Sequence, residues 1–138
     1  MKSRETVIRL KRFQVEEKRR KLVQIEAMIA EFERMVADLD REIQSEQDRA
    51  GIHDPGHFAY PTYAKAAMQR RENLKRSTDE LRGQLDDAKA AFEDVSEELK
   101  KAEALDERDQ MRERVDESGQ VECALDTIGS LRLRHAAV

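Results

Sequence analysis

Apolar residues recur along this chain in two long runs with heptad spacing, separated by a short polar segment. In the first half the two rows of the repeat are Ile8, Val15, Leu22, Ile29, Val36 and Ile43, and then Ile25, Phe32 and Leu39. In the second half they are Leu74, Leu81, Ala88, Val95 and Ala102, and then Leu85, Phe92 and Leu99. A 4-3 spacing kept over this length is typical of a helix that buries one narrow stripe against another helix. The pattern therefore predicts an all-α fold built from two long helices in a coiled coil.

Glycine and proline residues separate the two runs. Gly51, Pro55, Gly56 and Pro61 lie close together, and both residue types interrupt helices. A second break is expected at Ser118-Gly119, where the second helix should end or kink. The expected elements are, in order, a helix over about 3–49, a turn over about 50–60, a helix over about 61–117 and an amphipathic or flexible tail over 118–138.

The distribution of charge favours pairing of the two helices within one chain. Residues 1–21 carry nine Lys or Arg against three Glu, while residues 84–117 carry thirteen Asp or Glu against six basic residues. The inner stretches reverse these signs, with an acidic excess in residues 22–50 and a basic excess in residues 62–83. Folding the chain back on itself places opposite signs side by side, whereas parallel pairing of two copies would bring like charges together. An antiparallel hairpin over residues 1–117, monomeric on its own, is therefore expected. A dimer held by pairing between chains is the alternative.

The hairpin also implies a register. In an antiparallel coiled coil each layer joins one residue of each helix, and pairs whose numbers sum to 110 place apolar residues opposite one another and centre the turn on Pro55. The expected pairs are Ile8–Ala102, Val15–Val95, Leu22–Ala88, Ile25–Leu85, Ile29–Leu81, Val36–Leu74 and Ile43–Ala67.

Composition reduces the number of function classes that fit this chain. Charged residues make up 41% of the chain and aromatic residues 4%, which is the composition of a coiled coil and not of a thick globular core. There is no nucleophile–base pair or Gly-rich phosphate loop, so neither an enzyme nor a cofactor is expected. The net charge of −4 argues against nucleic acid as a partner. The sequence has no apolar run long enough to span a membrane, no recognisable secretory signal and a single cysteine, Cys123, which together suit the cytoplasm.

Three segments are candidates for binding. The basic start of the first helix is either a solvated face, a contact for an acidic protein, or a contact for anionic lipid or nucleic acid. His53, Asp54 and His57 resemble a metal trio, but turn and cap hydrogen bonds are the expected role, and no metal site is predicted.

The third segment, residues 58–63, holds three of the six aromatic residues of the chain. These rings either plug the open end of the hairpin or anchor a protein partner. We expect the rings of Tyr60 and Tyr63 to stay exposed, because two helices enclose too little interior to bury them.

Several short sequence segments resemble the FliJ family of flagellar type III export proteins. They are the basic start at residues 2–13, the segment His57-Phe58-Ala59-Tyr60-Pro61-Thr62-Tyr63-Ala64, the segment Arg70-Arg71-Glu72-Asn73-Leu74, and the late Leu105-Asp106-Glu107-Arg108. The resemblance covers roughly residues 1–117 and is closest to the alphaproteobacterial branch.

The resemblance implies an antiparallel coiled coil like the central stalk of rotary ATPases. Such a protein couples the hexameric export ATPase to the cytoplasmic domain of the membrane export gate, binds export chaperones and serves flagellum biogenesis and motility. It would act in the cytoplasm, peripherally at the inner membrane. The gate-binding residues would be Tyr60, Tyr63 and Ala67, where the family carries Leu at the last position. The ATPase-binding residues would be Arg9, Arg12, Glu107 and Arg108. The alternative function is a coiled-coil escort for secreted cargo that does not act on the ATPase.

Overall fold

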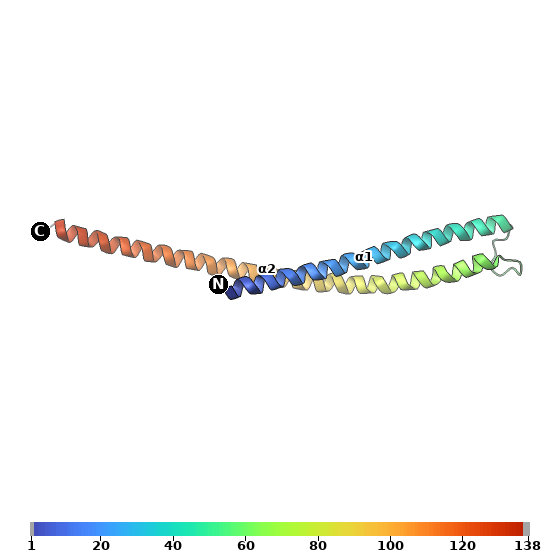
Figure 1. Ribbon diagram of the computed structural model, residues 1–138, viewed down its shortest axis with the longest axis horizontal. Helices are drawn as coiled ribbons and strands as arrows, with labels where there is room; N and C mark the ends of the chain where they lie inside the picture. The colour runs from blue at the N-terminus through green and yellow to red at the C-terminus, as the bar shows by residue number, and fades with distance from the viewer. Residues whose placement is uncertain (1, 137–138) are drawn as a thin grey trace. The chain divides into compact units, whose positions relative to one another are not determined.

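The fold consists of two long α-helices joined by one loop (Figure 1). The computed structural model describes the backbone of residues 2–136 and the side chains of residues 3–120. Helix α1 spans Lys2–Ala50, and helix α2 spans Thr62–Ala136. The two helices pack against each other, and the described residues include no strand. The all-α, two-helix hairpin predicted from the heptads is therefore confirmed.

Local chemistry accounts for both ends of the loop. Gly51 has a φ of 71° and donates its backbone N–H to the carbonyl of Gln47 at 2.8 Å. This left-handed conformation is cheap only for glycine, and it closes α1 with a satisfied carbonyl. At the other end the carbonyl of Pro61 accepts the N–H of Lys65 at 3.1 Å, so α2 begins directly after a residue that cannot itself extend a helix backwards.

The expected end of the second helix near residue 117 is wrong. Helix α2 continues through Ser118 and Gly119 to Ala136. A glycine inside a helix costs about 1 kcal/mol relative to alanine, which weakens a helix without ending it when no proline follows. Gly119 does not adopt the positive φ that a terminating glycine uses.

By contacts between residues, the chain divides into two compact units that do not follow the expected boundary at residue 117. One consists of residues 1–12 with residues 96–138, and the other of residues 13–95. In the second unit, α1 and α2 run antiparallel and bury two apolar clusters. The first contains Ile25, Ile29, Leu81 and Ala88 with Leu22, Phe32 and Leu85 packed against it, and the second contains Leu39, Ile43 and Ala67 with Met68 and Leu74.

These clusters follow the expected register. The first brings together the predicted pairs Leu22–Ala88, Ile25–Leu85 and Ile29–Leu81, and the second brings together Ile43–Ala67. In the unit that contains the N-terminus, Ile8 is buried and lines one groove together with its predicted partner Ala102.

Polar residues also occupy the seam between the helices. Continuing the row of Leu85, Phe92 and Leu99 backwards by sevens leads to Thr78 and Arg71. Thr78 is only 5% exposed, and its hydroxyl donates to the carbonyl of Leu74 at 2.8 Å. Arg71 bonds Asp40 across the helix pair at 2.8 Å. A polar group that pairs across a coiled-coil seam favours one register, so the bond of Arg71 to Asp40 disfavours a slipped pairing, whereas the bond of Thr78 stays within its own helix.

The register can be tested with engineered cysteines. In a Cys123→Ser background, the pair Ile43→Cys and Ala67→Cys should form a disulfide within one chain, because both residues belong to one buried cluster and face each other in the register. Non-reducing electrophoresis should show a crosslinked monomer of altered mobility. The control pair Val36→Cys and Ala67→Cys is shifted by one heptad and should not crosslink within the chain. Oxidation that yields only dimers of the first pair would contradict the hairpin.

Candidate functional site

The loop between the helices is held by its own hydrogen bonds. The Oδ1 atom of Asp54 accepts the N–H of Gly56 at 3.0 Å, and the carbonyl of Asp54 accepts the N–H of His57 at 3.0 Å. His57 then accepts the N–H of Ala59 on Nδ1 at 3.0 Å and the N–H of Tyr60 on its carbonyl at 3.1 Å. Asp54 and His57 thus serve turn hydrogen bonds, as expected. These bonds join residues of the loop to one another and order its backbone.

His53 is turned away from this network. Its Nε2 lies 3.1 Å from Oδ1 of Asp48, the carboxylate near the end of α1. The hydrogen bond from His53, with a second from Gln44, lowers the pKa of Asp48. No cluster of three or more histidine, cysteine, aspartate or glutamate side chains within residues 3–120 could hold a metal ion.

Tyr60 contradicts the expectation that both tyrosine rings stay exposed. It is only 7% exposed. Its hydroxyl accepts a hydrogen bond from Nε2 of Gln47 at 2.8 Å and lies 3.4 Å from the sulfur of Met68. The ring is buried because residues from both helix ends, and not only the facing seam position, close around it. Tyr60 therefore closes the end of the hairpin as a structural residue.

Tyr63 is exposed, as the sequence predicted, with 56% of its surface open to solvent. Its hydroxyl donates to the carboxylate of Glu42 at 2.9 Å, and this hydrogen bond raises the pKa of Tyr63. Ala67, the third predicted gate residue, is 6% exposed and belongs to the apolar cluster with Leu39 and Ile43. Of the three predicted residues, only Tyr63 therefore presents a large surface to a partner.

Phe58 is the most exposed large apolar residue among the described side chains. It is 96% exposed and stacks on the ring of His57, with ring centroids 4.7 Å apart and an interplanar angle of 22°. The sequence marked Phe58 only as one of three clustered aromatic residues. Phe58 and Tyr60 both lie between Gly56 and Pro61, so position in the loop alone does not separate the exposed ring from the buried one.

In the unit that contains the N-terminus, Arg4 forms ion pairs with three acidic residues. This side chain lies 3.7 Å from Asp106, 3.0 Å from Asp109 and 2.9 Å from Glu113. Desolvation acts to lower the pKa of Arg4, but the hydrogen bonds and the attraction of Glu113 and Asp109 outweigh it and raise the pKa. Arg4 thus ties the start of α1 to three acidic residues of α2.

The neighbouring ion pairs differ from the expected ones. The register of pairs whose numbers sum to 110 places Glu98 opposite Arg12, but Glu98 pairs with Lys11 at 3.5 Å. Arg12 pairs with Glu103 at 3.2 Å. Lys11 occupies a seam position seven residues after Arg4 and is half-buried, whereas Arg12 is exposed.

The other residues predicted to bind the ATPase lie on the surface of the same unit. Arg9, Glu107 and Arg108 are all exposed. Beside them a groove of about 320 Å³ is lined by Val7, Ile8, Ala102 and Leu105 together with Ser3, Arg4, Asp106 and Asp109. Val7 and Leu105 are 47% and 58% exposed, so apolar and charged surface alternate here.

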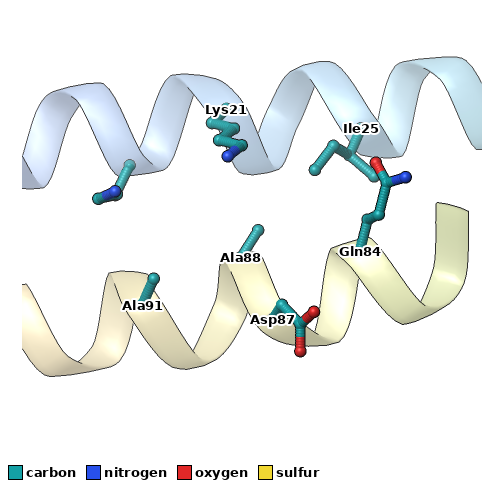
Figure 2. A pocket seen from close by; sticks show the side chains of 7 residues that line it. Lys21, Ile25, Gln84, Asp87, Ala88 and Ala91 are labelled. Carbon is teal, nitrogen blue, oxygen red and sulfur yellow. The ribbon is translucent and has the colours of Figure 1, made fainter.

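A second groove, of about 360 Å³, lies between α1 and α2 within residues 13–95 (Figure 2). The small side chains of Ala88 and Ala91 leave the space, and Lys21 and Ile25 extend towards it from α1. Lys18, Gln84 and Asp87 complete the lining. The groove pairs lysine ammonium groups with a single carboxylate, a set suited to solvation and weak polar contact. None of its lining residues is a nucleophile paired with a base.

Comparisons with family models, curated proteins and solved structures give no match to this chain. Within the described residues, no helix is both long and apolar enough to cross a membrane.

Proposed function

We propose that this protein is a non-enzymatic coiled-coil component of the bacterial flagellar type III export apparatus. In this role it couples the export ATPase hexamer to the cytoplasmic domain of the membrane export gate and assists the delivery of export chaperones. It acts in the cytoplasm at the face of the inner membrane. The proposal rests on the resemblance of residues 1–117 to the FliJ family. The observation that carries it is the pair of exposed aromatic side chains, Phe58 and Tyr63, at the loop end of two long paired helices.

The gate contact is assigned to the loop and the start of α2. Tyr63 is exposed there, and its ring and hydroxyl offer both apolar area and a hydrogen bond at low entropic cost. Tyr60 and Ala67 support this surface from within, because both are buried. In this proposal they shape the contact without touching the partner.

The ATPase contact is assigned to Arg9, Arg12, Glu107 and Arg108. All four are exposed and charged, which suits a contact that is steered by electrostatics and remains weak enough to be reversible. A single asymmetric hairpin cannot satisfy six equivalent sites at once, so about one chain is expected per hexamer.

Binding measurements with the purified full-length chain test both contacts. The chain should bind the export ATPase and the cytoplasmic domain of the gate separately. The double variant Arg9→Glu and Arg12→Glu should bind the ATPase roughly tenfold more weakly, while wild-type binding should weaken as salt rises. Gate binding by this variant should be unchanged, and circular dichroism should show unchanged helicity.

The matched control is the double variant Arg34→Glu and Arg41→Glu, which reverses two exposed charges on α1 within residues 13–95. It should bind the ATPase as the wild type does. ATPase binding that is independent of salt and equal in both double variants would contradict the assigned contact. Binding to a cargo chaperone but to neither the ATPase nor the gate would instead favour the escort function, for which the exposed apolar surface of Val7 and Leu105 is a second observation.

A further inference from the structure

Phe58 is held out into solvent by an ordered turn. The side chain is 96% exposed, yet the residues on both sides are fixed by the hydrogen bonds of Asp54 and of His57. Tyr60 secures the far side of the turn through its buried ring and its bond to Gln47. An exposed ring on an ordered turn gives the isolated hairpin almost no burial energy. It does give a partner a ring whose backbone is already in place.

His57 contributes a stacked ring and a hydrogen-bond donor to this surface. Its ring stacks on Phe58 with centroids 4.7 Å apart. Because Nδ1 accepts the N–H of Ala59, the neutral ring carries its proton on Nε2. The pair therefore presents an apolar double ring with one hydrogen-bond donor at its edge.

We propose that Phe58 and His57 form a preformed anchor that inserts into an apolar pocket of a folded protein partner. The rim of that pocket supplies a carboxylate or carbonyl oxygen to the Nε2–H of His57. This inference rests on the proposed function, in which the partner is the cytoplasmic domain of the gate, and it deepens that function. Phe58 is the main anchor, Tyr63 a peripheral contact and Tyr60 the support of the turn.

Charge favours a protein pocket over the other possible occupants. Residues 42–65 carry four carboxylates, Glu42, Glu46, Asp48 and Asp54, against Arg49 and Lys65, so the segment that holds the rings has an acidic excess. An anionic lipid surface would be repelled by these groups. A second copy of the same loop would bring the same carboxylates together. A pocket with a polar rim accommodates both the rings and the charges.

Binding to the purified cytoplasmic domain of the gate, measured by calorimetry, tests the anchor. Phe58→Ala should weaken binding by about 30-fold, the loss typical of a central aromatic anchor. Its melting temperature should shift by less than about 2 °C, because the side chain is exposed. The control Phe13→Ala removes another exposed phenyl ring, 57% exposed and on α1, and should leave gate binding unchanged.

Two variants of His57 separate its ring from its hydrogen bond. His57→Asn keeps a side-chain acceptor for the N–H of Ala59, as in an Asx-turn, but removes the stacked ring. His57→Ala removes both the acceptor and the ring. Binding should fall in the order wild type, His57→Asn, His57→Ala, and equal binding by all three would remove His57 from the anchor.

The possible failures are distinguishable. If the wild type binds the gate domain and the affinity of Phe58→Ala is within about threefold of the wild-type affinity, the anchor is overturned and the proposed function stays intact. No binding of the wild type to the gate domain would overturn both. Self-association in light scattering that is lost in Phe58→Ala, or sedimentation with vesicles containing phosphatidylserine, would assign the ring to another occupant and also overturn the anchor.

Discussion

Tyr60→Ala is expected to destabilise the hairpin by about 3–5 kcal/mol, the cost of removing a large buried aromatic side chain. The ring is 7% exposed and its hydroxyl bonds Gln47 and approaches Met68, so the change leaves both a cavity and an unpaired amide. Tyr60→Phe keeps the ring and should cost only about 1–3 kcal/mol through the lost hydrogen bond. Urea denaturation followed by circular dichroism measures each value.

The matched control is Tyr63→Ala, three residues further along the chain. Its ring is 56% exposed, so the substitution should cost less than about 1 kcal/mol. Equal losses of stability in Tyr60→Ala and Tyr63→Ala would show that the two tyrosines do not differ in burial. If both losses were also below about 1 kcal/mol, the sequence-based expectation that both rings face solvent would be restored.

Ile29→Ala is expected to destabilise the hairpin by roughly 2–4 kcal/mol. Ile29 is 9% exposed and shares a cluster with Ile25 and Leu81, so truncation opens a cavity in the seam. The adjacent Met28 is 45% exposed, and Met28→Ala should cost less than about 1 kcal/mol. Thermal melts of Ile29→Ala and Met28→Ala compare the stability lost at a buried and an exposed position that are neighbours in one helix.

A third variant compares packing with charge. Lys18→Ala removes a partly exposed cation and should also cost less than about 1 kcal/mol. If Ile29→Ala and Lys18→Ala shifted the melting temperature equally, the assignment of the apolar seam would be wrong.

The sequence by itself determined the two helices, the loop between them and their antiparallel pairing, but not the end of α2. Heptad spacing specifies which stripe of each helix is buried, because only residues three and four apart share a helix face. Gly51 and Pro61 specify the loop because their backbones end or start helices. The register followed from the same rows, and the clusters around Ile25 and Ile43 agree with it.

Other features depended on how side chains meet in three dimensions. The burial of Tyr60 depends on Gln47 of α1 and Met68 of α2. The periodicity of one helix does not predict contacts that come from two helices. Arg4 gathers three carboxylates because a long side chain reaches several turns of the facing helix, which residue-to-residue register counting does not capture. The continuation of α2 past Gly119 has a different cause, because it depends on a balance of small local propensities that the positions of Gly and Pro do not reveal.

The exposure of Phe58 is the clearest case of a feature that only the tertiary structure decided. Composition and pattern place three aromatic residues in one segment, but they do not say which ring turns inward. The fold decides this: the hydroxyl of Tyr60 meets Gln47 and Met68 and its ring is buried, whereas Phe58 stacks on His57 and stays exposed. Local pattern thus determined where the helices run, while the packing of a few side chains at the loop decided which residues are left for a partner.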